Sequence, residues 1–133
     1  MLMIVRCFAY DYSTITGTKA SGAEISGYSG ALEGNVVDFG ADKKGKKDSS
    51  KAIQKALDYA IDNGSNSVQI KVVVPKGKYR IDKLLEIYSN TWLYLEDGAT
   101  IVRNFDKGCM IKNAQANGAG GYGSERNIVI EGG

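Results

Sequence analysis

Glu96 and Asp97 are the only adjacent pair of acidic residues in this 133-residue chain. A pair of carboxylates is what most glycoside hydrolases use to cleave a sugar chain. On a strand, however, neighbouring side chains point to opposite faces, so these two carboxylates cannot flank one bond. The dipeptide Asp97-Gly98 is more typical of a turn. We therefore assign no catalytic residue in this sequence.

Three aromatic side chains are better candidates for contact with a ligand. In the segment TWLYLE, Trp92 and Tyr94 alternate with two leucines, which places both rings on the outer face if the leucines are buried. Tyr122 lies in a glycine-rich loop, where its ring could stack on a sugar. The candidate substrate-binding residues are therefore Trp92, Tyr94 and Tyr122. The alternative is that N-terminal residues cover the outward rings.

The residue types disfavour several other kinds of site. The chain has no histidine, which removes His-based triads and His metal ligands. Cys7 and Cys109 match no metal spacing, and a disulfide between them is left open. Residues 118–123 spell G-x-G-x-x-G, but strand-like residues follow where a dinucleotide site requires a helix. We expect neither a metal nor a cofactor.

The charge balance argues against a nucleic-acid or membrane partner. Seventeen basic and 15 acidic residues give a net charge of +2. Lysines 43, 44, 46 and 47 are a local exception, which we interpret as a solvated turn, with a polyanion site as the alternative. No apolar run reaches the roughly 18 residues of a membrane span. At the N-terminus Arg6 follows the apolar run instead of preceding it, which is not the order of a signal peptide.

The best-defined element that could position these side chains is a helix over about residues 49–63. Apolar residues recur in pairs every four residues, as on one face of a helix. Asp48 or Ser49 is expected to accept hydrogen bonds from the first turn, and Gly64 to end the helix in the left-handed conformation. The apolar stripe consists of Ala52, Ile53, Ala56, Leu57, Ala60 and Ile61.

Short strands account for most of the remaining chain. Residues 35–41, NVVDFGA, are interpreted as a strand that Gly40 ends. From residue 68 onward, apolar runs of about three to six residues are separated by Asn, Asp and Gly, with no helical pattern between them. We therefore expect a mainly β fold, a solenoid in which short strands stack coil on coil. Residues 1–34 are interpreted as an N-terminal arm or linker that could include one short strand.

Three segments in order resemble the N-terminal part of the pectate-lyase-like superfamily of right-handed parallel β-helix proteins. They are VVDFGADKKGKKDSSKAIQKALDYA, VVVPKGKYRIDKLLEIYSNTWLYLEDGATI and RNIVIEGG. The resemblance covers residues 35–133 and implies an N-terminal capping helix and the first two to three coils of a β-helix, truncated at the C-terminus. One departure is DKKGKKDSS, which stands where relatives often carry an acidic run.

The resemblance also implies a function. The parent would be a carbohydrate-active protein, polygalacturonase-like, with a polysaccharide as its partner. The catalytic motifs of such enzymes lie on later coils and cannot be placed on this chain, so the segment alone is expected to be inactive and to nucleate and cap the solenoid. Two alternatives stay open: a structural or receptor-binding β-helix of a trimeric phage tail protein, and a small carbohydrate-binding module. The sequence leaves the location unknown, and the family resemblance is compatible with an extracellular or virion location.

Overall fold

The computed structural model describes residues 32–65, 67–114 and 125–133. Of the expected arm over residues 1–34, only the last three residues are described, and they belong to the first strand. No helix in the described part is long and apolar enough to cross a membrane. The elements are β1 (Leu32–Asn35), β2 (Lys44–Asp48), α3 (Ser50–Asn63), β3 (Ile70–Val74), β4 (Gly77–Ile81), β5 (Leu85–Ile87), β6 (Thr91–Leu95), β7 (Ala99–Arg103), β8 (Ile111–Asn113) and β9 (Val129–Gly132).

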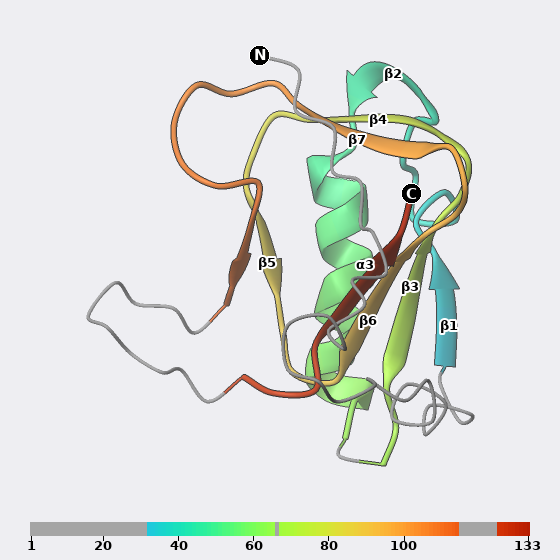
Figure 1. Cartoon of the computed structure of the whole chain (residues 1–133), viewed down its shortest axis with the longest axis vertical. Helices are drawn as coiled ribbons and strands as arrows, with labels where there is room; N and C mark the ends of the chain where they lie inside the picture. Colours follow the sequence, from blue (N-terminus) through green and yellow to red (C-terminus); the bar gives the residue numbers. More distant parts are fainter. Residues whose placement is uncertain (1–31, 66, 115–124) are drawn as a thin grey trace, which may run out of the picture.

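These strands form three parallel sheets, in the orders β1-β3-β6-β9, β2-β4-β7 and β5-β8. Each strand pairs with its equivalent one coil later along the chain, so β3, β4 and β5 make one coil and β6, β7 and β8 the next. The fold is a right-handed parallel β-helix, as expected. Figure 1 shows the strands of the three sheets arranged around a central space.

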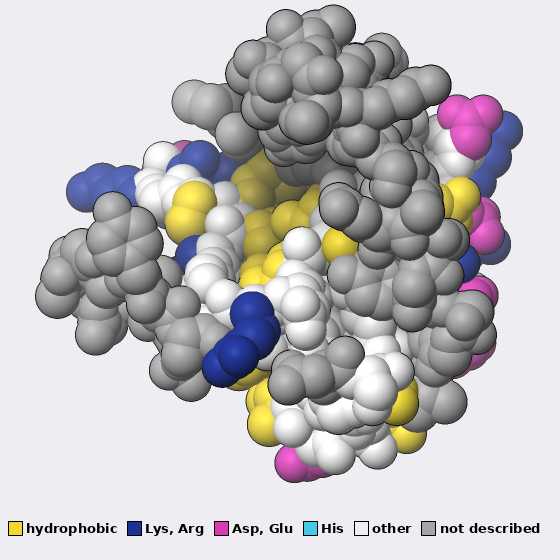
Figure 2. All heavy atoms as spheres, turned by 60° about the horizontal axis from the view of Figure 1, so that its bottom comes forward, with side chains coloured by type: hydrophobic (Ala, Val, Ile, Leu, Met, Phe, Trp, Pro, Cys, Tyr) yellow, Lys and Arg dark blue, Asp and Glu magenta, His cyan; other side chains and the backbone are white. Residues whose placement is uncertain are grey.

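Apolar side chains from successive coils stack in that space. Val72 lies opposite Leu93 in the first sheet, and Tyr79 lies opposite Ile101 in the second, and all four side chains are fully buried. Burial of apolar surface contributes a favourable free energy of about 25 cal/mol per Å² and is the main term that stabilises such a core. Figure 2, which brings the bottom of Figure 1 forward, shows hydrophobic side chains gathered in the middle of that face.

Helix α3 packs against β3, β5 and β6. Ile53, Ala56, Leu57 and Ala60 are buried, as the apolar stripe predicts. The inclusion of Ile61 was wrong, because its side chain is 54% exposed. At 100° per residue Ile61 lies roughly 80° around the helix axis from Ile53, at the edge of the stripe, where no strand covers it.

At the two ends of α3, the hydrogen bond expected from Asp48 or Ser49 is confirmed for Asp48, and the cap expected at Gly64 is wrong. Asp48 Oδ1 accepts the backbone N–H of Ser50, but the Ser49 hydroxyl accepts the N–H of Asp42 and makes no capping bond to the helix. Gly64 is extended, with φ of −81°, so the left-handed cap was wrong. A Cβ at Gly64 would lie 2.7 Å from the Ala60 carbonyl oxygen, so close backbone approach explains the glycine.

The chain before α3 also differs from the expectation. The strand predicted over residues 35–41 is wrong, because the strand ends at Asn35 and the next residues form turns. Asn35 causes this locally: its carbonyl accepts the N–H of Asp38, and its side-chain Oδ1 accepts the N–H of Val37. The lysine-rich segment interpreted as a turn includes strand β2, which pairs with β4.

Candidate functional site

The outer face of the sheet β1-β3-β6-β9 carries the two described aromatic candidates. Parallel register places Glu33, Lys71 and Trp92 side by side across β1, β3 and β6. Tyr94 lies two residues along β6, beside Glu131 of β9. Leu93 and Leu95 between them are buried in the core, which leaves the aromatic rings on the outer face as the alternation predicts.

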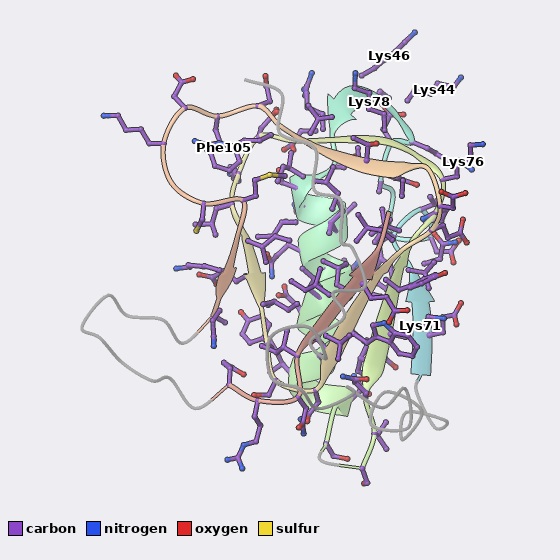
Figure 3. All side chains as sticks on the ribbon, viewed as in Figure 1. Lys44, Lys46, Lys71, Lys76, Lys78 and Phe105 are labelled. Carbon is purple, nitrogen blue, oxygen red and sulfur yellow. The ribbon has the colours of Figure 1, made fainter. Side chains whose placement is uncertain are left out.

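Lys71 connects the two rings. Its Nζ lies 4.8 Å from the centroid of the Trp92 ring and 4.6 Å from that of Tyr94. The two centroids are 6.1 Å apart with an interplanar angle of 72°, an edge-to-face arrangement. The Lys71 ammonium also forms an ion pair with Glu33 at 3.4 Å. Figure 3 shows the Lys71 side chain at the outer side of this sheet.

This geometry limits what the aromatic pair can do. A flat platform for a sugar ring requires open, coplanar faces, whereas here one ring meets the edge of the other and an ammonium covers both. Cation–π contacts of this kind contribute about 0.5–1 kcal/mol each at exposed sites. The cluster instead offers ring edges and a cation that Glu33 partly neutralises.

Glu33, Lys71 and Glu131 are site residues that sequence reasoning missed. They come from three strands that the chain separates by many residues, so only the register of the sheet brings them beside the aromatic pair. Lys71 lies between the buried residues Ile70 and Val72 in β3, which was a signal that its side chain points outward. Glu131 Oε2 is buried and accepts no hydrogen bond from the described residues.

The acidic pair that opened the sequence analysis has a structural role. Glu96 Oε2 accepts the backbone N–H of Lys76 at 3.0 Å, which ties the end of β6 to the preceding coil. Asp97 and Gly98 form the expected turn, closed by the Ala99 N–H to the Glu96 carbonyl. The two carboxylates therefore do not converge on one point.

Other candidate groups give no further site in the described ranges. No cluster of three or more Cys, Asp or Glu side chains there could hold a metal ion. Cys109 is a free, exposed thiol. Tyr122, Cys7 and the glycine-rich loop of residues 118–123 lie outside the described residues.

Comparison with known protein families gives one match to a family model. The family model described as rhamnogalacturonase A/epimerase, pectate lyase-like, matches residues 34–131. No curated protein sequence gives a match.

Two solved structures are similar in fold. The A-module of the mannuronan C-5 epimerase AlgE4 of Azotobacter vinelandii is 24% identical, with a TM-score of 0.54 over 74% of this chain and 27% of that one. The family 28 exopolygalacturonase of Yersinia enterocolitica is 28% identical, with a TM-score of 0.56 over 75% of this chain and 19% of that one. The present chain therefore spans only 27% and 19% of their lengths.

Proposed function

This chain belongs to the rhamnogalacturonase A/epimerase, pectate lyase-like family, and from that membership we propose that it forms the N-terminal cap and first coils of a carbohydrate-active β-helix. The parent activity that we propose is that of a polygalacturonase-like glycoside hydrolase. The adjacent acidic pair Glu96 and Asp97 does not converge on one point, so the proposal gives this segment a folding role and a share of substrate contact, without catalysis.

The packing of α3 carries the capping part of the proposal. A stacked coil leaves its apolar interior open at each end, and a terminal element with a polar outer side must cover it. Ile53 and Leu57 are fully buried against the coils, whereas Lys51, Lys55 and Tyr59 of the same helix are exposed. In Figure 1 the helix lies across the space that the three sheets surround.

The outer face of the sheet β1-β3-β6-β9 supports the substrate-contact part. Trp92 and Tyr94 are half-buried beside Lys71, so a sugar with hydroxyl and carboxylate groups would meet ring edges and a cation there. The names of the two similar structures refer to mannuronan and to polygalacturonan, both polysaccharides. We therefore take an oligogalacturonide as the test ligand for Trp92, Tyr94 and the undescribed Tyr122.

Binding can be followed by the fluorescence of Trp92, because it is the only tryptophan in the chain. Titration with oligogalacturonides should shift its fluorescence emission in a saturable way. Tyr94→Ala should weaken that binding about two- to tenfold, the range for loss of one aromatic contact of about 0.5–1.5 kcal/mol.

Leu84→Ala is the control, because Leu84 is 37% exposed and lies between β4 and β5, which belong to other sheets than Trp92 and Tyr94. It should leave the titration unchanged. A flat titration with the wild-type chain, or equal losses in the two variants, would contradict the proposed substrate contact.

A further inference from the structure

Six exposed lysines gather along one edge of the β-helix. We call this set the lysine ridge; it consists of Lys43, Lys44, Lys46, Lys47, Lys76 and Lys78. Four of the residues come from β2 and the turn before it, and the other two from β4 and the turn before it. Figure 3 shows Lys44, Lys46 and Lys78 close together at β2, pointing away from the body of the molecule, with Lys76 further along the same side.

Pairing between coils holds the ridge together. Lys44 is the register partner of Lys78, and the Lys78 N–H donates to the Lys43 carbonyl at 2.8 Å. Glycines make room for the lysine side chains of the neighbouring coil. A Cβ at Gly77 would lie 2.8 Å from Lys43 Cβ, and one at Gly45 would lie 3.2 Å from Lys78 Cγ. The lysines of the two coils therefore lie against each other's backbone.

The positive charge of the ridge is only partly offset, because six lysines lie beside the two carboxylates of Asp42 and Asp48. No ridge lysine forms an ion pair with another residue of the described ranges, where the paired cations are Lys71, Arg80 and Lys112. The carboxylate of Asp42 instead accepts the backbone N–H groups of Lys44, Lys46 and Lys47 at 2.8–3.0 Å. These bonds, together with the nearby positive charge of Lys47, lower the pKa of Asp42 and fix the turn.

Other nearby carboxylates already have hydrogen-bond or ion-pair partners, and Glu96 is one that lies beside the ridge. Asp82 pairs with Arg80 at 3.0 Å, and Glu96 accepts the Lys76 N–H. Like charges brought together by folding repel one another, so a cluster of this kind has a cost that a bound anion removes. The ridge therefore has the properties of a binding surface for a ligand with several negative charges.

We propose that the lysine ridge binds a linear acidic polysaccharide, with negative groups of successive sugars contacting lysines of successive coils. Neighbouring strands lie about 4.8 Å apart, so the ridge presents its charges in two close rows, one from β2 and one from β4. A chain with one carboxylate per sugar presents a comparable row of charges. The ridge lies on the sheet β2-β4-β7, a different sheet from that of Trp92 and Tyr94.

The residue types favour a polysaccharide over a nucleic acid. Single-stranded nucleic acids bind to aromatic side chains on which the bases stack, and Tyr79, the aromatic residue next to Lys78, is fully buried. Phosphate recognition often uses the bidentate arginine fork, but Arg80 is already held by Asp82 and by the Lys46 carbonyl. The choice of a polysaccharide rests on the proposed function, whereas the preference for a polyanion rests on the ridge alone.

The test compares two triple variants of the full chain. K44Q/K46Q/K78Q removes three ridge lysines, and K51Q/K55Q/K107Q removes three exposed lysines elsewhere. Each removes three positive charges, which changes the net charge from +2 to −1. Affinity for polygalacturonate is measured by isothermal titration calorimetry at several salt concentrations, with neutral dextran and duplex DNA as comparison polymers. The Trp92 fluorescence titration is run in parallel.

The ridge variant should bind polygalacturonate about tenfold or more weakly at low salt, with a shallower salt dependence, because fewer counterions are released. The control variant should stay within about twofold of the wild type. Equal weakening of binding in both variants, or no calorimetric binding by the wild type, would contradict the proposal that the ridge binds a polyanion. Equal binding of dextran or DNA by the wild type would overturn the acidic polysaccharide as its partner.

The two readouts separate the ridge from the proposed function. A Trp92 response in the wild type, with calorimetric binding unchanged in the ridge variant, overturns the proposed role of the ridge and leaves the proposed substrate contact intact. Loss of calorimetric binding in the ridge variant with no Trp92 response in the wild type supports the ridge and overturns the substrate contact at Trp92.

Discussion

Asn127 Nδ2 donates a hydrogen bond of 2.9 Å to Asn90 Oδ1, and the two asparagines occupy the same turn in successive coils. Both have left-handed backbone conformations, with φ of 61° and 56°. The Asn90 N–H also donates to the Arg126 carbonyl at 2.9 Å. Asparagine tolerates the left-handed region better than most residues, so one residue type provides both the turn and a side-chain link between coils.

We expect Asn90→Ala to lower the free energy of unfolding by about 2 kcal/mol, because it removes the side-chain hydrogen bond and because alanine tolerates the left-handed conformation less well than asparagine. Asn90→Gly loses the hydrogen bond but tolerates the conformation, so it should cost about half as much. Urea unfolding of the two variants measures the difference. Equal losses would show that backbone conformation does not contribute at this turn.

The pH dependence of stability should report on Asp48. Burial raises the pKa of this carboxyl group, but hydrogen bonds from Ser50 and from the Asp82 backbone outweigh it, and the net pKa is lowered from 3.8. Because the folded pKa lies below the unfolded value, the ionised group stabilises the fold above the unfolded pKa. That contribution is lost as pH falls through the folded pKa.

Asp48→Asn should therefore flatten the acid limb of the stability profile below about pH 4. Urea unfolding at a series of pH values measures the profile. Asp62→Asn is the matched control, because Asp62 is an exposed carboxylate on α3. An acid limb in Asp48→Asn as steep as in the wild type would contradict the role of Asp48.

The helix and the buried strands could be predicted from the sequence because each depends on a local period. The four-residue pairing of Ile53 with Leu57 is visible within one helix, and so is the alternation of Leu93 with Trp92. Burial in the structure follows both patterns. The order in which these elements stack was predicted from the family resemblance, because the periodicity of residues within one element gives no information about its neighbours.

The features that were missed depend on partners far away in the chain. Strand β2 has no apolar alternation, and only its pairing with β4 makes it a strand. Glycine at position 64 is explained by the Ala60 carbonyl and the Asn90 side chain, which lie within 3.1 Å of an added Cβ. The cluster of Lys71 with Trp92 needed the register between β3 and β6. The sequence contains no local signal for such contacts.

The capping role of α3 is the central claim, and a pair of lysine substitutions on the helix tests it most directly. Leu57 is fully buried against the coils, whereas Ile61 is 54% exposed. Leu57→Lys and Ile61→Lys therefore introduce the same charged side chain at a buried and at an exposed position of one helix. Hydrogen exchange of the β3, β4 and β5 amides, with light scattering, reports whether the coils stay closed and monodisperse.

Leu57→Lys should remove protection from those strands and cause self-association, because an uncovered apolar end and its strand edges are exposed. Ile61→Lys should keep the protection and the mass of the wild type. If Leu57→Lys leaves the coils as protected and as monodisperse as Ile61→Lys does, α3 is not the cap of this β-helix.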